Sequence, residues 1–132
     1  MIVLECGTND LATGQSVESV ADFYADLLGQ LSTRAPRALL WPQSVFPAHP
    51  IRWRECSPPV ATCQCAKLNA QIRQLNALLA QVAAKRDLPF LDVSAALEEN
   101  GELNRPYTAD GTHLNGEVYR VWRAAILGAP RE

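Results

Sequence analysis

Residues 2–10 of the chain read IVLECGTND, a short apolar run followed at once by a polar turn. The apolar run, residues 2–6, is short and stops at a glycine, which predicts a buried strand. Gly7, Asn9 and Asp10 are ordinary turn residues, so the turn could be purely structural. Its chemical interpretation is that Asn9, at the carboxyl end of the strand, offers a side-chain N–H to an oxyanion.

Outward from this stretch, apolar runs alternate with segments of helical periodicity. The sequence predicts further strands at 38–41 and 89–93, and helices at 16–36, 66–86, 95–99 and 115–127. Residues 47–65 are rich in proline and lack any period, so they are predicted to form a long loop, of the kind that often covers a site. Strands alternating with helices indicate an α/β fold with a parallel sheet and right-handed crossovers. Ligands of such sheets bind at the carboxyl ends of the strands.

A second polar motif, Asp110-Gly111-Thr112-His113, comes just before the last predicted helix. The offset of three residues in a turn with a glycine lets both ionisable side chains point to one place. An aspartate that accepts from one imidazole nitrogen fixes the tautomer and leaves the other nitrogen as a general base. The alternative is a surface loop in which the two residues have no chemical role.

Taken together, the two motifs and their flanking residues resemble the GDSL (SGNH) ester hydrolases over nearly the whole chain. The resemblance implies that Asn9 and Gly7 form the oxyanion-binding block, that His113 is the base and that Asp110 orients it. It also implies a flavodoxin-like, three-layer αβα fold with a five-stranded parallel sheet. Residues 1–132 would then be a single partial domain, truncated to about the last three strands. The implied activity is hydrolysis of a small-molecule acyl ester by a Ser-His-Asp mechanism that needs no cofactor.

The sequence departs from that family in lacking the nucleophile block, because no Gly-Asp-Ser occurs in it. The serines present are Ser16, Ser19, Ser32, Ser44, Ser57 and Ser94. Ser44, which follows a predicted strand, is the least implausible substitute, whereas Ser16 and Ser19 fit the start of a helix. We therefore expect an ester hydrolase that is inactive alone. The alternative is a non-catalytic homologue that acts as a binding or interaction protein.

The cysteine-rich segment offers a third hypothesis. His49, Cys56, Cys63 and Cys65 are residue types that bind zinc, but their spacing lacks the usual Cys-x-x-Cys pairs. We favour reduced thiols in a loop and expect no metal site. Glu5, within an otherwise apolar strand, could contact the active site or a partner, but a structural hydrogen bond is the favoured interpretation.

Composition restricts the partners. A formal net charge of -2 without a basic patch argues against nucleic acid, and no apolar run is long enough to span a membrane. If Met1 is the true start the protein is expected in the cytoplasm, and a secreted or periplasmic location stays open if a segment precedes it. The family fold places two more strands beyond residues 2–6. Without them this strand is an open apolar edge, so we expect a homo-oligomer formed through it.

Overall fold

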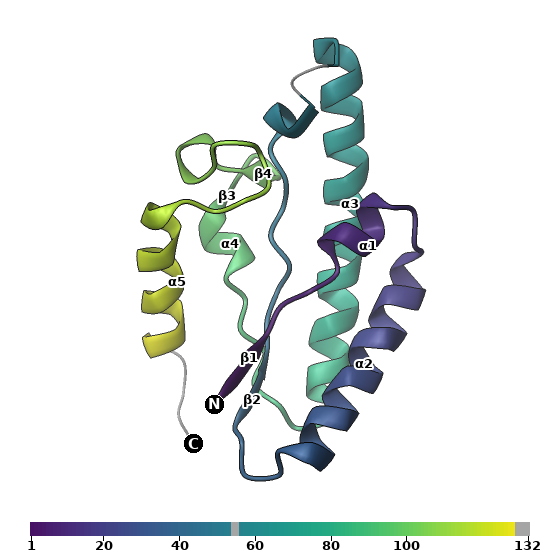
Figure 1. The fold of residues 1–132 in the computed structure, drawn as a ribbon, viewed down its shortest axis with the longest axis vertical. Helices are drawn as coiled ribbons and strands as arrows, with labels where there is room; N and C mark the ends of the chain where they lie inside the picture. Colours follow the sequence, from purple (N-terminus) through teal and green to yellow (C-terminus); the bar gives the residue numbers. More distant parts are fainter. Residues whose placement is uncertain (54–55, 129–132) are drawn as a thin grey trace. The chain divides into compact units, whose positions relative to one another are not determined.

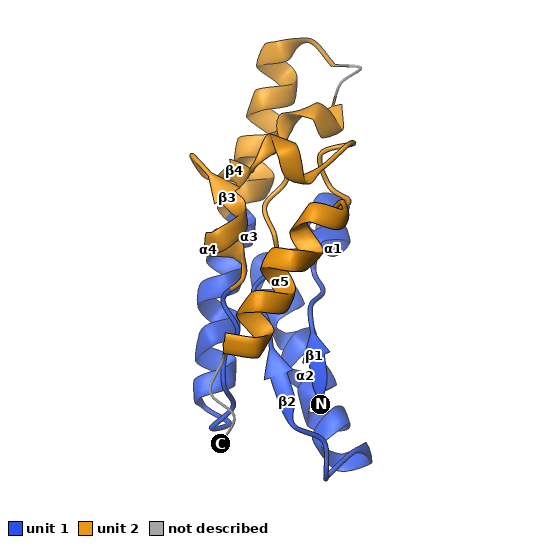
Figure 2. Ribbon diagram, turned by 90° about the vertical axis from the view of Figure 1, so that its left-hand side faces the viewer, with its two compact units in different colours: residues 1–45, 71–92 blue, residues 46–70, 93–132 orange. Residues whose placement is uncertain are grey.

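The computed structural model describes residues 1–53 and 56–128 (Figure 1). The elements in chain order are β1 (Ile2–Leu4), α1 (Thr8–Ala12), α2 (Val17–Arg34), β2 (Leu40–Pro42), η1 (Pro50–Trp53), α3 (Pro58–Ala84), α4 (Ser94–Leu97), β3 (Glu98–Glu99), β4 (Glu102–Leu103), η2 (Arg105–Tyr107) and α5 (Gly116–Gly128). They form two compact units, residues 1–45 with 71–92 and residues 46–70 with the segment from 93 onward, which Figure 2 shows in different colours.

The first unit contains the parallel sheet that the sequence predicts. β1 and β2 pair in parallel, with Val3 opposite Trp41. Leu91 continues the sheet as a single parallel bridge to Gln43, with its N–H 2.8 Å from the Pro42 carbonyl oxygen. The predicted strand 89–93 is therefore reduced to one bridge. An apolar run shows that a segment is buried, but it does not show whether the segment pairs along its length or through one bridge.

Helix α2 begins where its sequence predicts. The Ser16 hydroxyl accepts from the Ser19 N–H at 3.1 Å, a standard N-cap. The helix buries Val20, Tyr24 and Leu28 along one face. The Tyr24 hydroxyl donates to the Leu4 carbonyl at 2.7 Å and accepts from the Gln43 N–H at 3.3 Å. One side chain of α2 thus hydrogen-bonds to the backbone at the ends of both strands.

The second unit is organised by a buried asparagine on α3. The Asn69 side-chain oxygen accepts from the Ala48 N–H at 2.7 Å, and its NH2 group donates to the carbonyl oxygens of Ala48 at 2.8 Å and Gly101 at 3.1 Å. These bonds hold an extended segment and the β3–β4 hairpin turn against the helix. Apolar side chains then fill the interior, among them Val93, Leu97, Leu103 and Val118.

Three predicted boundaries are wrong. The predicted loop 47–65 contains η1, and α3 already begins at Pro58, so Cys63 and Cys65 lie on a helix. Two prolines indicate a loop in a sequence, yet proline is also favoured at the first helical positions, where no intrahelical N–H is needed. The turn after strand 2–6 contains the short helix α1, and the predicted helix 95–99 ends at Leu97, after which β3 begins at Glu98. In the described ranges, no helix is both long enough and apolar enough to cross a membrane.

Candidate active site

The Asp110–His113 turn lies between η2 and α5. An antiparallel bridge between Thr108 and Leu114 brings the two ends of the turn together. After the turn, the Asn115 side-chain oxygen accepts from the Glu117 N–H at 3.0 Å, which caps the start of α5. The turn is therefore fixed on both sides by local hydrogen bonds, in keeping with the need to hold two side chains in register.

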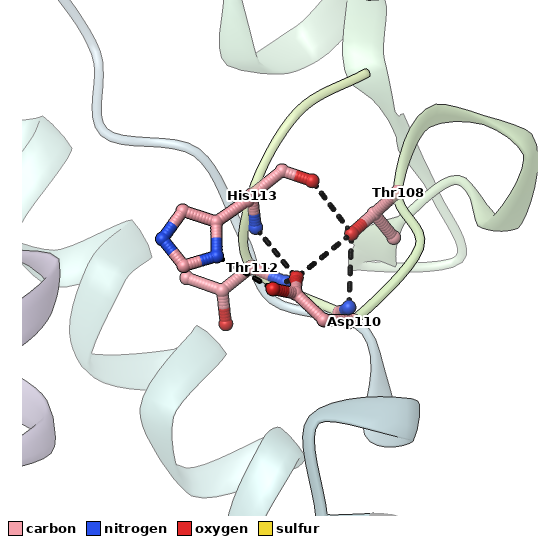
Figure 3. A network of polar contacts seen from close by, with 5 residues as sticks. Thr108, Asp110, Thr112 and His113 are labelled. Atoms are coloured by element: carbon pink, nitrogen blue, oxygen red, sulfur yellow. Dashed lines mark hydrogen bonds and ion pairs between the residues drawn. The ribbon is translucent and has the colours of Figure 1, made fainter.

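Asp110 and His113 form the pair that their spacing predicts. The His113 Nδ1 atom is 2.6 Å from Asp110 Oδ2, and Asp110 Oδ1 accepts from the backbone N–H groups of Thr112 at 2.9 Å and His113 at 2.8 Å (Figure 3). The hydrogen bond to His113, followed by those two N–H groups, holds the pKa of Asp110 well below its usual range. The carboxylate is thus ionised at neutral pH and acts as the acceptor for Nδ1.

The other face of the imidazole is open. The His113 side chain is 87% exposed and that of Asp110 48% exposed. With Nδ1–H donating to the carboxylate, Nε2 carries the free lone pair and can take a proton from an incoming hydroxyl. An imidazole held in this way has the geometry that a general base needs, with its free nitrogen in reach of solvent.

Gly111 is required by the way the turn packs. Its φ is +90°, and a Cβ atom there would lie 2.6 Å from the His49 carbonyl oxygen and still closer to the Arg52 backbone nitrogen. The His49 N–H donates to the Gly111 carbonyl oxygen at 2.9 Å. Any side chain at this position would therefore push the Asp110–His113 turn away from the segment that supports it.

Asn9 and Gly7 belong to the first unit. Gly7 is buried with a φ of +128°, and an added Cβ would meet Leu75 Cδ2 at 2.9 Å, so the chain can turn sharply after β1 only with glycine here. Asn9 is the second residue of α1 and is exposed, and its side-chain amide makes no hydrogen bond to any residue in the described ranges. The amide is free to act as a donor. Its proximity to His113 stays a prediction.

The family model described as the GDSL-like lipase/acylhydrolase family matches residues 1–121. The chain belongs to this family. Family membership and the small parallel sheet with flanking helices confirm the α/β fold class, and the family is one of hydrolases.

Solved structures share the fold. A GDSL-like lipase from Bacteroides thetaiotaomicron is 26% identical with a TM-score of 0.74, and the match covers 96% of this chain and 60% of that one. A Bacteroides fragilis protein is 22% identical with a TM-score of 0.73, covering 95% of this chain and 58% of that one. Among curated proteins, an N-acylneuraminate cytidylyltransferase from Streptococcus agalactiae is 27% identical over 112 residues, which are 85% of this chain and 24% of that protein. The chain thus spans about a quarter of this relative and little more than half of the solved structures.

In this GDSL-like protein, Ser44 is a poor substitute for the family's nucleophile. It is fully buried, and its N–H donates to the Leu91 carbonyl oxygen at 3.0 Å. A side chain that no ester can reach cannot attack one. Ser16 is occupied as the α2 cap, as the sequence predicts.

The cysteines of the segment predicted as a loop do not come together with His49 in the described part of the chain. Among the described residues, which include His49 and all four cysteines, no three ligand-type side chains come together. The Cys65 thiol is buried and donates to the Ala48 carbonyl oxygen at 3.2 Å, and burial raises the pKa of this thiol to about 11. It is an inert structural group. Burial also raises the pKa of Glu5, and a hydrogen bond to its carboxyl stays a prediction.

Sequence reasoning missed Thr108. This buried residue contacts the turn through its hydroxyl, which accepts from the Gly111 N–H at 2.9 Å. Its position two residues before Asp110 is the available signal, because a hydroxyl there can bond to the backbone of the turn that follows.

Proposed function

We propose that this chain provides the base, the orienting acid and the oxyanion donor of a carboxylic-ester hydrolase. The observation that carries the proposal is the 2.6 Å contact between Asp110 and His113 with the other imidazole nitrogen open to solvent, in a member of a hydrolase family. The nucleophilic serine would lie on a segment outside the 132 residues, since the sequence contains no Gly-Asp-Ser.

The proposed reaction begins when His113 Nε2 removes the proton from the serine hydroxyl as its oxygen attacks the ester carbonyl carbon. The carbonyl oxygen becomes an oxyanion, which the Asn9 side-chain N–H stabilises. When the tetrahedral intermediate collapses, His113 returns its proton to the leaving alcohol. Water then repeats the sequence on the acyl-serine and releases the acid. Asp110 stays ionised throughout and stabilises the imidazolium.

The second candidate function is a non-catalytic homologue that binds a partner or ligand. It is favoured by the same absence of a Gly-Asp-Ser from the sequence. The two candidates differ in whether a reactive serine comes to lie against His113.

An affinity-tagged chain expressed in its source cells separates these candidates. We expect the purified assembly to hydrolyse p-nitrophenyl acetate and to contain a serine that reacts with a fluorophosphonate probe. His113→Ala should abolish turnover. Asn9→Ala should have a smaller effect and lower turnover by about 10²–10³-fold. The control is Thr33→Ala, which removes an exposed hydroxyl on α2 that donates to the Gly29 carbonyl of the same helix. An assembly without turnover and without a labelled serine would favour the non-catalytic homologue.

A further inference from the structure

The Thr108 hydroxyl is placed at the centre of the Asp110–His113 turn. The Thr108 side chain accepts from the Gly111 N–H at 2.9 Å, and its Oγ1 lies 2.8 Å from the His113 carbonyl oxygen and 3.4 Å from Asp110 Oδ1 (Figure 3). A hydroxyl has one proton to donate. The shorter contact assigns that proton to the His113 carbonyl, so one side chain joins the backbone of residue 111 to that of residue 113.

Thr108 is itself firmly held. It is 2% exposed, and its carbonyl oxygen accepts from Arg105 Nη1 at 2.5 Å. It also pairs with Leu114 across the antiparallel bridge. A buried β-branched side chain has a strongly restricted χ1 angle, so its hydroxyl has little freedom to leave the turn.

We propose that Thr108 is a positioning residue of the site. By fixing the backbone on both sides of Thr112, its hydroxyl keeps two N–H groups aimed at Asp110 Oδ1 and keeps the His113 ring within reach of Asp110 Oδ2. Its importance for catalysis rests on the proposed function. Its effect on the Asp110–His113 pair does not, because that effect is present in the chain without substrate.

The expected size of the effect follows from one lost neutral hydrogen bond, which shifts an equilibrium by roughly two- to tenfold. Thr108→Val keeps the shape of the side chain but removes the hydroxyl, which leaves the buried Gly111 N–H without its acceptor. The ratio of paired to unpaired His113 should fall by that factor. Thr108→Ser keeps the hydroxyl and should retain most of the pairing.

The test is ¹⁵N NMR of the imidazole nitrogens in the 132-residue chain at neutral pH. The chain has two histidines, so His49, whose Nδ1 accepts from the Ile51 N–H at 3.2 Å, is an internal reference. In the wild type, His113 should show the tautomer with the proton on Nδ1. Thr108→Val should decrease this tautomer while Thr108→Ser does not. Thr112→Val is the matched control, because the Thr112 hydroxyl bonds to no residue in the described ranges.

The proposal is overturned if Thr108→Val leaves the His113 signals unchanged, or if Thr108→Ser disturbs them as much as Thr108→Val does. Should Thr108→Val fail to fold, amide exchange of Gly111 in the wild type decides. A protected Gly111 N–H supports its bond to Thr108, and exchange as fast as in an open loop contradicts it. Because neither measurement uses an ester, a failure of the proposed function would leave both results intact.

Discussion

At the scale of single residues, Asp110 is the group whose ionisation the turn controls most directly. Three hydrogen bonds, from the His113 ring and from the N–H groups of Thr112 and His113, favour its charged form. A carboxyl whose pKa is lowered by folding contributes stability above its unfolded pKa of about 4, and this contribution is lost as the pH falls toward the folded value.

The first prediction follows from that sign. Asp110→Asn should be less stable than the wild type at pH 7, and the difference should narrow as the pH falls below about 4. Urea unfolding at pH 7 and pH 3 measures it. The control is Asp22→Asn, which removes an exposed carboxylate on α2 and should change the unfolding free energy little at either pH. A difference for Asp110→Asn that is the same at both pH values would contradict the assigned hydrogen bonds.

Two glycines give a second residue-scale prediction of opposite signs. Gly111→Ala should destabilise the protein by about 1–3 kcal/mol, because its φ of +90° is unfavourable and its Cβ would collide with the backbone of His49 and Arg52. Gly29→Ala lies within α2, and an added Cβ there would meet nothing within 4 Å beyond its chain neighbours and its own helix backbone. It should stabilise the protein by about 0.5–1 kcal/mol. Thermal unfolding of both variants checks the pair. Equal effects of the two substitutions would contradict the close contact assigned between Gly111 and residues 49–52.

At the scale of elements, two asparagine side chains of α3 each bond to both the N–H and the carbonyl of one residue. Asn76 accepts from the Val45 N–H at 2.7 Å and donates to the Val45 carbonyl at 2.9 Å, and Asn69 does the same for Ala48. The asparagines are seven residues apart and the residues they bind are three apart. Each side-chain amide takes the place that a neighbouring strand's peptide group would occupy, which explains how an extended segment is satisfied without a strand partner.

The third prediction tests these asparagine–backbone hydrogen bonds. Asn69→Leu removes the side-chain partner of the Ala48 N–H and of the Gly101 carbonyl, whereas the Ala48 carbonyl still accepts from Cys65 and Leu103. Each group left unsatisfied costs about 1–3 kcal/mol. We expect a loss of several kcal/mol in urea unfolding, large enough to leave little folded protein. Gln74→Leu, an exposed position on the same helix, is the control and should change stability by less than about 0.5 kcal/mol. A small effect of Asn69→Leu would mean that water replaces the amide.

The elements also show where sequence reasoning succeeds and where it fails. Helix α2 was predictable because its apolar period and the Ser16 cap are local signals. The Asp110–His113 pair was predictable for the same reason, because its members are only three positions apart. The asparagine contacts join residues 21 to 32 positions apart, and the Thr108 hydroxyl acts only once the chain has turned. The asparagine contacts leave no pattern that a single sequence can reveal, and Thr108 leaves only its position two residues before Asp110.

At the scale of the whole molecule, the chain spans 60% or less of the solved structures that share its fold. The fourth prediction is that the 132-residue chain alone has little or no activity on p-nitrophenyl acetate. Without a serine nucleophile, only oxyanion stabilisation and binding could remain, about 10³–10⁴ over water at best. Robust turnover that a serine-directed phosphonate abolishes would contradict this, and labelling would then identify which of the chain's own serines reacts.

The edge of the sheet leads to the last prediction. Among the described residues β1 pairs with β2 alone. The Ile2 N–H donates to the Leu39 carbonyl and the Leu4 carbonyl accepts from the Gln43 N–H, so by alternation the polar backbone groups of Val3 point to the open edge. Met1 and Phe23, which are 66% and 77% exposed, add apolar surface to the same unit.

An open apolar edge is stable in solution when a second strand covers it. We therefore expect two copies to pair through β1 about a two-fold axis, and light scattering at micromolar concentration should give twice the chain mass. Val3→Pro removes the N–H at the open edge without touching the bonds to β2 and should yield a monomer. The control is Val60→Ser, a change at an exposed apolar residue of α3 that should leave the dimer intact. A wild-type monomer would refute the edge argument, and a dimer that survives Val3→Pro would place the interface on another surface.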